Sequence, residues 1–381
     1  MNSSSFIIFI MLFGSVGCYS EKTITEPQPS SEYNEYLKKI AEELTEEERK
    51  EIREQLIADK EIIKLNTALV TTEENLAALN GHLSDDPFIL SKQLEFLRWY
   101  RNPMFVMCDG IPWIPSKQLK NFNYLFEYRD KIRKVSKSVG MIQLYHKIDD
   151  DELELIKGEL ATALAMDSNH IITNAHVLQE SDLIFKRDGK WVLPSKIVLK
   201  VIFPNEYEFC KAREVGKEIV VTEIVEFNSD LDYVILKADS NDLVPISMIA
   251  DKVSEGDEVV VIGYPSTPYP GQDGLPLTFE QITRVYSTPD GNTPVSVLRL
   301  SPGRIIPKDR KKEPNIYRHD ASTWGASSGS IVMRLKDGAF VGLHQGGMHA
   351  KKEGAGFNFA IIPSKIPFLT QKLTNKSIRF K

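Results

Sequence analysis

A serine in a run of small residues lies near the C-terminal end of the chain. The run GASSGS, residues 325–330, has Ser328 near its centre and is followed by the β-type stretch IVM. A tight turn of this composition exposes a hydroxyl and leaves main-chain N–H groups directed at one point, as a nucleophile beside an oxyanion hole requires. Because Ser/Gly runs are usually plain loops, this stretch alone does not define a site.

Two upstream stretches carry the groups that could activate such a serine. His176 ends an apolar strand-like run and begins a helical turn, in HIITNAHVL at residues 170–178. Asp232 directly precedes an apolar strand, in NSDLDYVILK at residues 228–237. A carboxylate there could accept from the imidazole and fix its tautomer. Asp230 is the competing carboxylate, and the register of the following strand favours Asp232.

Together these stretches resemble the chymotrypsin-like (trypsin-like) serine peptidases, in the branch that holds bacterial glutamyl endopeptidases and Deg-like members. The order His, Asp, Ser is that of the family. TNAH at residues 173–176 matches the histidine motif, and DYVIL at 232–236 matches the aspartate motif. ASSGS at 326–330 matches Gly-x-Ser-Gly-Ser with one departure, and EGDEVVVIGYP at 255–265 is similar to the opening of the second barrel.

The resemblance implies the role of each residue. Ser328 would attack the peptide carbonyl, and His176 would take its proton and pass it to the leaving amine. Asp232 would orient the imidazole. The main-chain N–H groups of Ser328 and Ala326 would form the oxyanion hole. The substrates would be proteins or peptides.

Ala326 is the departure, because the family has Gly at this position. Gly adopts backbone angles that Ala resists, so the oxyanion hole is expected to be strained or to form only with substrate. Making Ser327 the nucleophile, with Gly325 as its glycine, fails to align the residues that follow. Ser327 stands where digestive members have Asp, so their zymogen switch is not available. A catalytically inactive binding protein that uses the peptidase fold is the alternative function.

Two further positions bear on specificity. Thr323 and His344 match residues with which glutamyl endopeptidases recognise an acidic P1 side chain. A hydroxyl and an imidazolium can both donate to a carboxylate. The resemblance thus implies an acidic P1 preference. A general-specificity peptidase is the alternative, since relatives without this preference share the histidine.

The pattern of elements changes along the chain. Residues 31–136 show helical spacing, as in Tyr33, Leu37, Ile40 and Leu44, and are expected to form an all-α segment without chemistry of its own. Many short β-type runs broken by turns follow in residues 137–381. With the resemblance, they predict an all-β peptidase domain of two six-stranded barrels.

The N-terminus predicts export. Residues 1–17 read as a signal peptide, too short to span a bilayer, and residues 18–30 as a linker. SVGC at residues 15–18 resembles the lipobox of bacterial lipoproteins, in which Cys18 would be lipidated. Ordinary cleavage after Gly17 is the alternative. The mature protein is therefore expected in the cell envelope, anchored by lipid to a membrane, or secreted.

Composition excludes other classes of function. The net charge of -6 and the lack of a basic stripe argue against a nucleic-acid partner. No HExxH, CxxC or glycine-rich phosphate loop occurs, so no metal or other cofactor is expected. The chain has three cysteines, Cys18, Cys108 and Cys210. Whether Cys108 pairs with Cys210 or both are buried thiols is open at this point.

Overall fold

The computed structural model describes residues 84–86, 89–90, 93, 102–114, 119–149, 152–179, 183–204, 216–250, 252–266, 297–308, 311–348, 356–374 and 379–380. The expected signal peptide, the linker, most of the helical pattern before residue 102, and Cys18 and Cys210 lie outside these residues. No helix within the described residues is long and apolar enough to cross a membrane.

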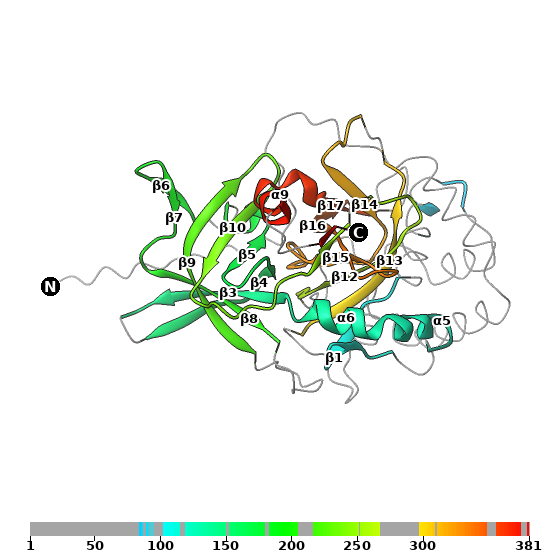
Figure 1. Cartoon of the computed structure of the whole chain (residues 1–381), viewed down its shortest axis with the longest axis horizontal. Coiled ribbons are helices and arrows are strands. Elements are labelled where there is room, and N and C mark those ends of the chain that lie inside the picture. The colour runs from blue at the N-terminus through cyan, green and yellow to red at the C-terminus, as the bar shows by residue number, and fades with distance from the viewer. Residues whose placement is uncertain are drawn as a thin grey trace.

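Six antiparallel strands close the first barrel, in the order β10-β5-β4-β3-β8-β9. Their bounds are β3 Val139–Lys147, β4 Leu153–Ala165, β5 His170–Thr173, β8 Ile197–Phe203, β9 Lys217–Asn228 and β10 Tyr233–Ala238. The short helix α7 (Ala175–Gln179) follows β5, and the hairpin β6 (Phe185–Arg187) and β7 (Lys190–Val192) follows α7. The barrel lies on the left of Figure 1.

A second ring of six strands lies beside the first (Figure 1). Its members are β12 Glu258–Gly263, β13 Arg299–Ile306, β14 Ile316–His319, β15 Ile331–Arg334, β16 Phe340–Met348 and β17 Phe357–Ile361. They follow one another in the order β12-β15-β16-β17-β14-β13, and β12 pairs back with β13. All six pairings are antiparallel. The predicted all-β double six-stranded barrel is therefore confirmed.

Successive side chains of a strand point to opposite faces, so one strand can contribute to two separate clusters of buried apolar residues. In β10, Val234 and Leu236 join a cluster drawn from the first barrel, whereas Ile235 between them joins a different cluster. The second cluster also takes Ile262, Leu300 and residues of several other elements from both barrels. This shared apolar layer packs the two barrels against each other, so residues from both can meet at fixed distances.

Elements outside the two rings complete the domain. The chain before residue 137 supplies β1 (Phe105–Cys108) and β2 (Ile111–Pro112), then α5 (Leu119–Phe122), the 3₁₀ helix η1 (Asn123–Tyr128) and α6 (Arg129–Ser136). Strand β1 pairs with β13, with Phe105 opposite Leu300. Cys108 at the end of β1 is disulfide-bonded, and its partner lies outside the described residues. The C-terminal part holds η2 (Pro363–Lys365), α9 (Pro367–Thr374) and β18 (Arg379–Phe380), which pairs with β11 (Met248–Ile249).

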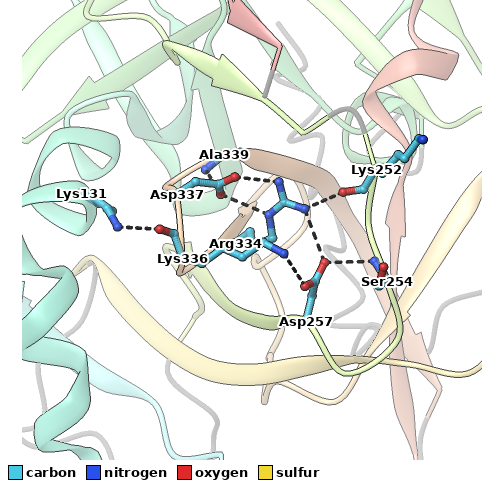
Figure 2. A network of polar contacts seen from close by, with 8 residues as sticks. All are labelled: Lys131, Lys252, Ser254, Asp257, Arg334, Lys336, Asp337 and Ala339. Atoms are coloured by element: carbon cyan, nitrogen blue, oxygen red, sulfur yellow. Dashed lines mark hydrogen bonds and ion pairs between the residues drawn. The ribbon is translucent and has the colours of Figure 1, made fainter.

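The buried side chain of Arg334, at the end of β15, joins several segments by polar contacts (Figure 2). Arg334 donates from Nη2 and Nε to the two carboxylate oxygens of Asp337, at 2.7 and 3.1 Å. Its Nη1 lies 2.5 Å from the Lys252 carbonyl and 3.4 Å from Asp257 Oδ2. In the same region, Lys131 Nζ of α6 donates a hydrogen bond to the Lys336 carbonyl at 2.7 Å. The network ties α6 and the loop before β12 to the β15–β16 turn.

Candidate active site

The pairing of β5 with β10 places Asp232 beside His176. Thr173 pairs with Val234, so the residues just beyond each strand end also lie close together. Asn174 Nδ2 donates to the Asp232 carbonyl at 2.9 Å. Asp232 has a φ of 54°, a left-handed conformation that Asp adopts more readily than most residues. The tight turn before β10 thus directs the carboxylate toward α7.

Both oxygens of the Asp232 carboxylate contact His176. Oδ1 accepts the main-chain N–H of His176 at 2.8 Å, and Oδ2 lies 2.8 Å from Nδ1 of the ring. The Asp232 side chain is 11% exposed and the His176 side chain 29% exposed. An ionised carboxylate at this distance favours the tautomer with a proton on Nδ1, which leaves Nε2 free of a proton and able to accept one.

Ser328 meets the opposite edge of the imidazole. Its Oγ lies 2.9 Å from His176 Nε2 and 3.3 Å from the Gln345 carbonyl of β16. Ser328 is half-buried, whereas Ser327 is buried and its Oγ accepts the Trp324 N–H at 3.1 Å. Asp230 is exposed. The structure therefore brings Ser328, His176 and Asp232 together, and does not place Ser327 or Asp230 in their positions.

Thr162 of β4, which the sequence did not single out as a site residue, anchors the serine loop to the first barrel. Its main-chain N–H donates to the Ser328 carbonyl at 2.9 Å, and its Oγ donates to the Ala326 carbonyl at 3.1 Å. The same Oγ accepts the Tyr264 N–H at 2.9 Å. From the other barrel, the His344 carbonyl accepts the Gly329 N–H at 2.9 Å. The loop is held from both sides.

Gly329 is required by this close packing. Its φ is 85°, and a Cβ added there would lie 2.0 Å from the Thr162 carbonyl oxygen. Any side chain would therefore push the serine loop away from β4. The glycine after Ser328 therefore has a steric reason as well as a conformational one.

Ala326 adopts the backbone conformation that the sequence analysis identified as difficult for this residue. Its φ is 62°, in the left-handed region that disfavours residues with a Cβ. In the part of the chain that the structure describes, neither the Ala326 N–H nor the Ser328 N–H donates to a protein acceptor. Main-chain N–H groups that are not used within the protein are the kind of donor that an oxyanion needs.

The two residues expected to bind an acidic side chain are engaged with other protein groups. The Thr323 hydroxyl donates to Asn358 Oδ1 at 3.0 Å. His344 is 2% exposed, and its Nδ1 lies 3.2 Å from Nε2 of the buried His319. Burial lowers the pKa of His344 to about 3, and the repulsion that a protonated His176 would exert acts in the same direction, against a main-chain hydrogen bond with Phe359. His344 is therefore a neutral imidazole near pH 7, and the expected imidazolium is absent.

The comparison of the sequence with protein families agrees with this geometry. Residues 161–343 match the trypsin-like peptidase domain family. The matched segment runs from β4 to β16 and includes His176, Asp232 and Ser328. It supports a serine-peptidase domain of the chymotrypsin-like class and does not distinguish a branch within that class.

Comparison with known structures and with curated proteins adds the following. The crystal structure of the serine endoprotease from Yersinia pestis is similar to this chain with 18% sequence identity and a TM-score of 0.41, over 65% of this chain and 67% of that one. No curated protein matches the sequence. Among the described residues, no group of three or more His, Cys, Asp or Glu side chains could hold a metal ion.

Proposed function

We propose that this protein is a serine endopeptidase that uses Ser328, His176 and Asp232. The observation that supports this most directly is the position of His176, with Nε2 at 2.9 Å from Ser328 Oγ and Nδ1 at 2.8 Å from Asp232 Oδ2. A nucleophile, a base and a group that orients the base are therefore within hydrogen-bonding distance before any substrate binds.

The reaction follows from these contacts. Ser328 Oγ bonds to the peptide carbonyl carbon while its proton moves to His176 Nε2. The carbonyl oxygen becomes an oxyanion that accepts from the N–H groups of Ser328 and Ala326. His176 then gives the proton to the leaving amine as the C–N bond breaks, and an acyl-enzyme remains. Water, deprotonated by His176, attacks this ester and releases Ser328. Asp232 stabilises the imidazolium in each half of the reaction.

A fluorophosphonate probe and a substrate digest test the proposal together. The folded protein should be labelled and should cut a denatured protein mixture, and Ser328→Ala should lose both activities. Ser327→Ala, one residue away and facing Trp324, is the matched control and should still be labelled. Folded protein that is neither labelled nor active would instead support the alternative of an inactive binding protein.

For specificity, we propose an acidic P1 preference that depends on neutral donors. Thr323 is half-buried and lies five residues before Ser328, on the same loop, and its hydroxyl would have to turn from Asn358 Oδ1 to the substrate carboxylate. A low pKa of His344 argues against a direct ion pair, so discrimination by charge should be modest. Mapping cut sites by mass spectrometry tests this. Cleavage mainly after basic or apolar residues would exclude it, and Thr323→Val should reduce any preference for Glu.

We also propose that the protein is exported. The apolar N-terminal run and the disulfide at Cys108 support this, because disulfides persist mainly in oxidising compartments. Lipid attachment at Cys18 would place the protein on a membrane surface. Incorporation of radiolabelled palmitate that is lost in Cys18→Ala would establish the anchor, and export without incorporation would indicate simple secretion.

A further inference from the structure

Six consecutive residues that precede the two barrels are buried against the second one. Residues 102–107 are all buried, and they include most of β1, which pairs with β13 through Phe105 opposite Leu300. At the end of β1, Cys108 is disulfide-bonded. This segment lies before residues 161–343, the part of the chain that matches the peptidase family. The second barrel therefore carries an added strand that comes from outside that part.

Asn102 contacts the point at which the serine loop begins. Asn102 is 5% exposed, and its Nδ2 donates to the Asp320 carbonyl at 2.9 Å. Asp320 follows directly after β14, at the start of the loop that leads to Ser328. From β13, the Arg304 N–H donates to Asp320 Oδ1 at 2.6 Å. The start of the serine loop is thus held both by β13 and by the segment that pairs with β13.

Met104 lies behind the same loop. It is 2% exposed and lines a small cavity together with Ser322, Ser327 and Ser330, all of which are buried. Ser327 directly precedes Ser328, and Ser330 follows Ser328 closely. The Met104 side chain therefore occupies space on the inner side of the loop, close to the residues on either side of the proposed nucleophile.

We propose that residues 102–108 form an internal brace that positions the serine loop, with Asn102 and Met104 as its positioning residues. The inference rests on the proposed peptidase function. Asn102 fixes where the loop leaves β14, and Met104 fills the space behind the loop. Ser328 Oγ thereby keeps its distance of 2.9 Å from His176 Nε2. Loss of either contact lets the loop shift, and a displacement of about 1 Å at a reacting atom can lower the rate about 10²-fold.

Two buried methionines of the brace give a matched test. Met104 and Met107 are each 2% exposed, but Met104 lines the cavity behind the serine loop, whereas Met107 belongs to the apolar cluster shared by the barrels. Replacement of either by Ala removes the same side-chain atoms, so the denaturant midpoint should shift similarly. For a peptide substrate, kcat should fall about 10²-fold in Met104→Ala and less than about threefold in Met107→Ala. Met104→Leu, which nearly keeps the volume, should retain kcat.

Asn102→Ala tests the other contact of the brace. It removes the bond to the Asp320 carbonyl and leaves Met104 in place. Its kcat should also fall relative to Met107→Ala, with a smaller change in KM, because the loop carries the reacting hydroxyl. Asn102→Ala replaces Met104→Ala if the latter does not fold. Equal kcat in the folded brace variant and in Met107→Ala would overturn the proposal.

Hydrogen exchange reports on the loop without catalysis. The Gly329 N–H donates to the His344 carbonyl at 2.9 Å. Exchange of this amide should be faster in the variants at Asn102 and Met104 than in Met107→Ala, because local opening of the loop becomes easier. Equal exchange would overturn the brace. Failure of the proposed function would instead appear as no Ser328-dependent activity in the unmodified protein, and the exchange measurement would still decide the role of the brace.

Discussion

Thr162 in the first barrel donates its main-chain N–H to the carbonyl of Ser328 in the second, at 2.9 Å. Its side-chain hydroxyl makes a second bond of the same kind, to the Ala326 carbonyl at 3.1 Å. The serine loop is therefore positioned by the barrel that carries His176 and Asp232, and the packing of the two barrels sets the distance between Ser328 and His176.

Thr162→Val removes the hydroxyl and keeps the shape of the side chain. The buried Tyr264 N–H and Ala326 carbonyl each lose a partner, so the free energy of unfolding should fall by about 2 kcal/mol. The value of kcat should fall as well, because the turn at Ala326 loses a support. Thr222→Val on β9 removes an exposed hydroxyl and is the control. Denaturant unfolding and steady-state kinetics measure both effects, and equal results for the two variants would contradict the role of Thr162.

Gly329→Ala tests the close approach of the serine loop to β4. Both Gly329 and Gly256 have a positive φ, but only at Gly329 would a Cβ meet another atom, the Thr162 carbonyl oxygen at 2.0 Å. Gly256→Ala should therefore cost about 1–2 kcal/mol from backbone strain alone. Gly329→Ala should cost at least about 1 kcal/mol more and should lose activity. Similar losses of stability in the two variants would show that the loop can move away without cost.

Much of this arrangement could be predicted from the sequence, where residue type and period are decisive. The apolar runs at 197–203 and 258–263 are two of the short β-type runs, and they form β8 and β12. The strand β14 was not predicted, because it contains the polar residues Arg318 and His319. These side chains can be buried because other groups pair with them; for example, the Glu313 carboxylate lies 2.7 Å from Arg318 Nε. Tertiary contacts determined that segment, and no local pattern reveals them.

The same limit applies to the site. The order of His176, Asp232 and Ser328 and their flanking residues were sufficient to select the three side chains. The sequence also indicated that Ala326 would be strained. It did not indicate that Thr162 holds the serine loop, because Thr162 acts through its main-chain N–H and a single hydroxyl. It assigned a charge to His344 that burial removes, since exposure is not visible in the sequence.

Asp232→Asn should separate geometry from electrostatics. The amide can still accept the His176 N–H, but its NH₂ group would face Nδ1 and favour the tautomer with the proton on Nε2. That imidazole cannot accept the proton of Ser328, and kcat for a peptide substrate should fall about 10⁴-fold. Asp230→Asn, a neighbouring exposed carboxylate, should change kcat less than about twofold. Activity near that of the unmodified protein in Asp232→Asn would exclude Asp232 from the mechanism.

The buried His344 should make the protein less stable in acid. Its pKa is about 3 in the folded state and about 6.5 when unfolded, so the unfolded chain binds one more proton between these values. Stability therefore falls as pH decreases from about 6.5 toward 3, by a total on the order of 4 kcal/mol from this group. His344→Gln removes the titrating ring and should reduce the slope of unfolding free energy against pH in this window. Denaturant unfolding at several pH values measures the slope. An identical slope in both proteins would mean that His344 is not held neutral by burial, and would restore a charged His344 as a candidate partner for an acidic substrate.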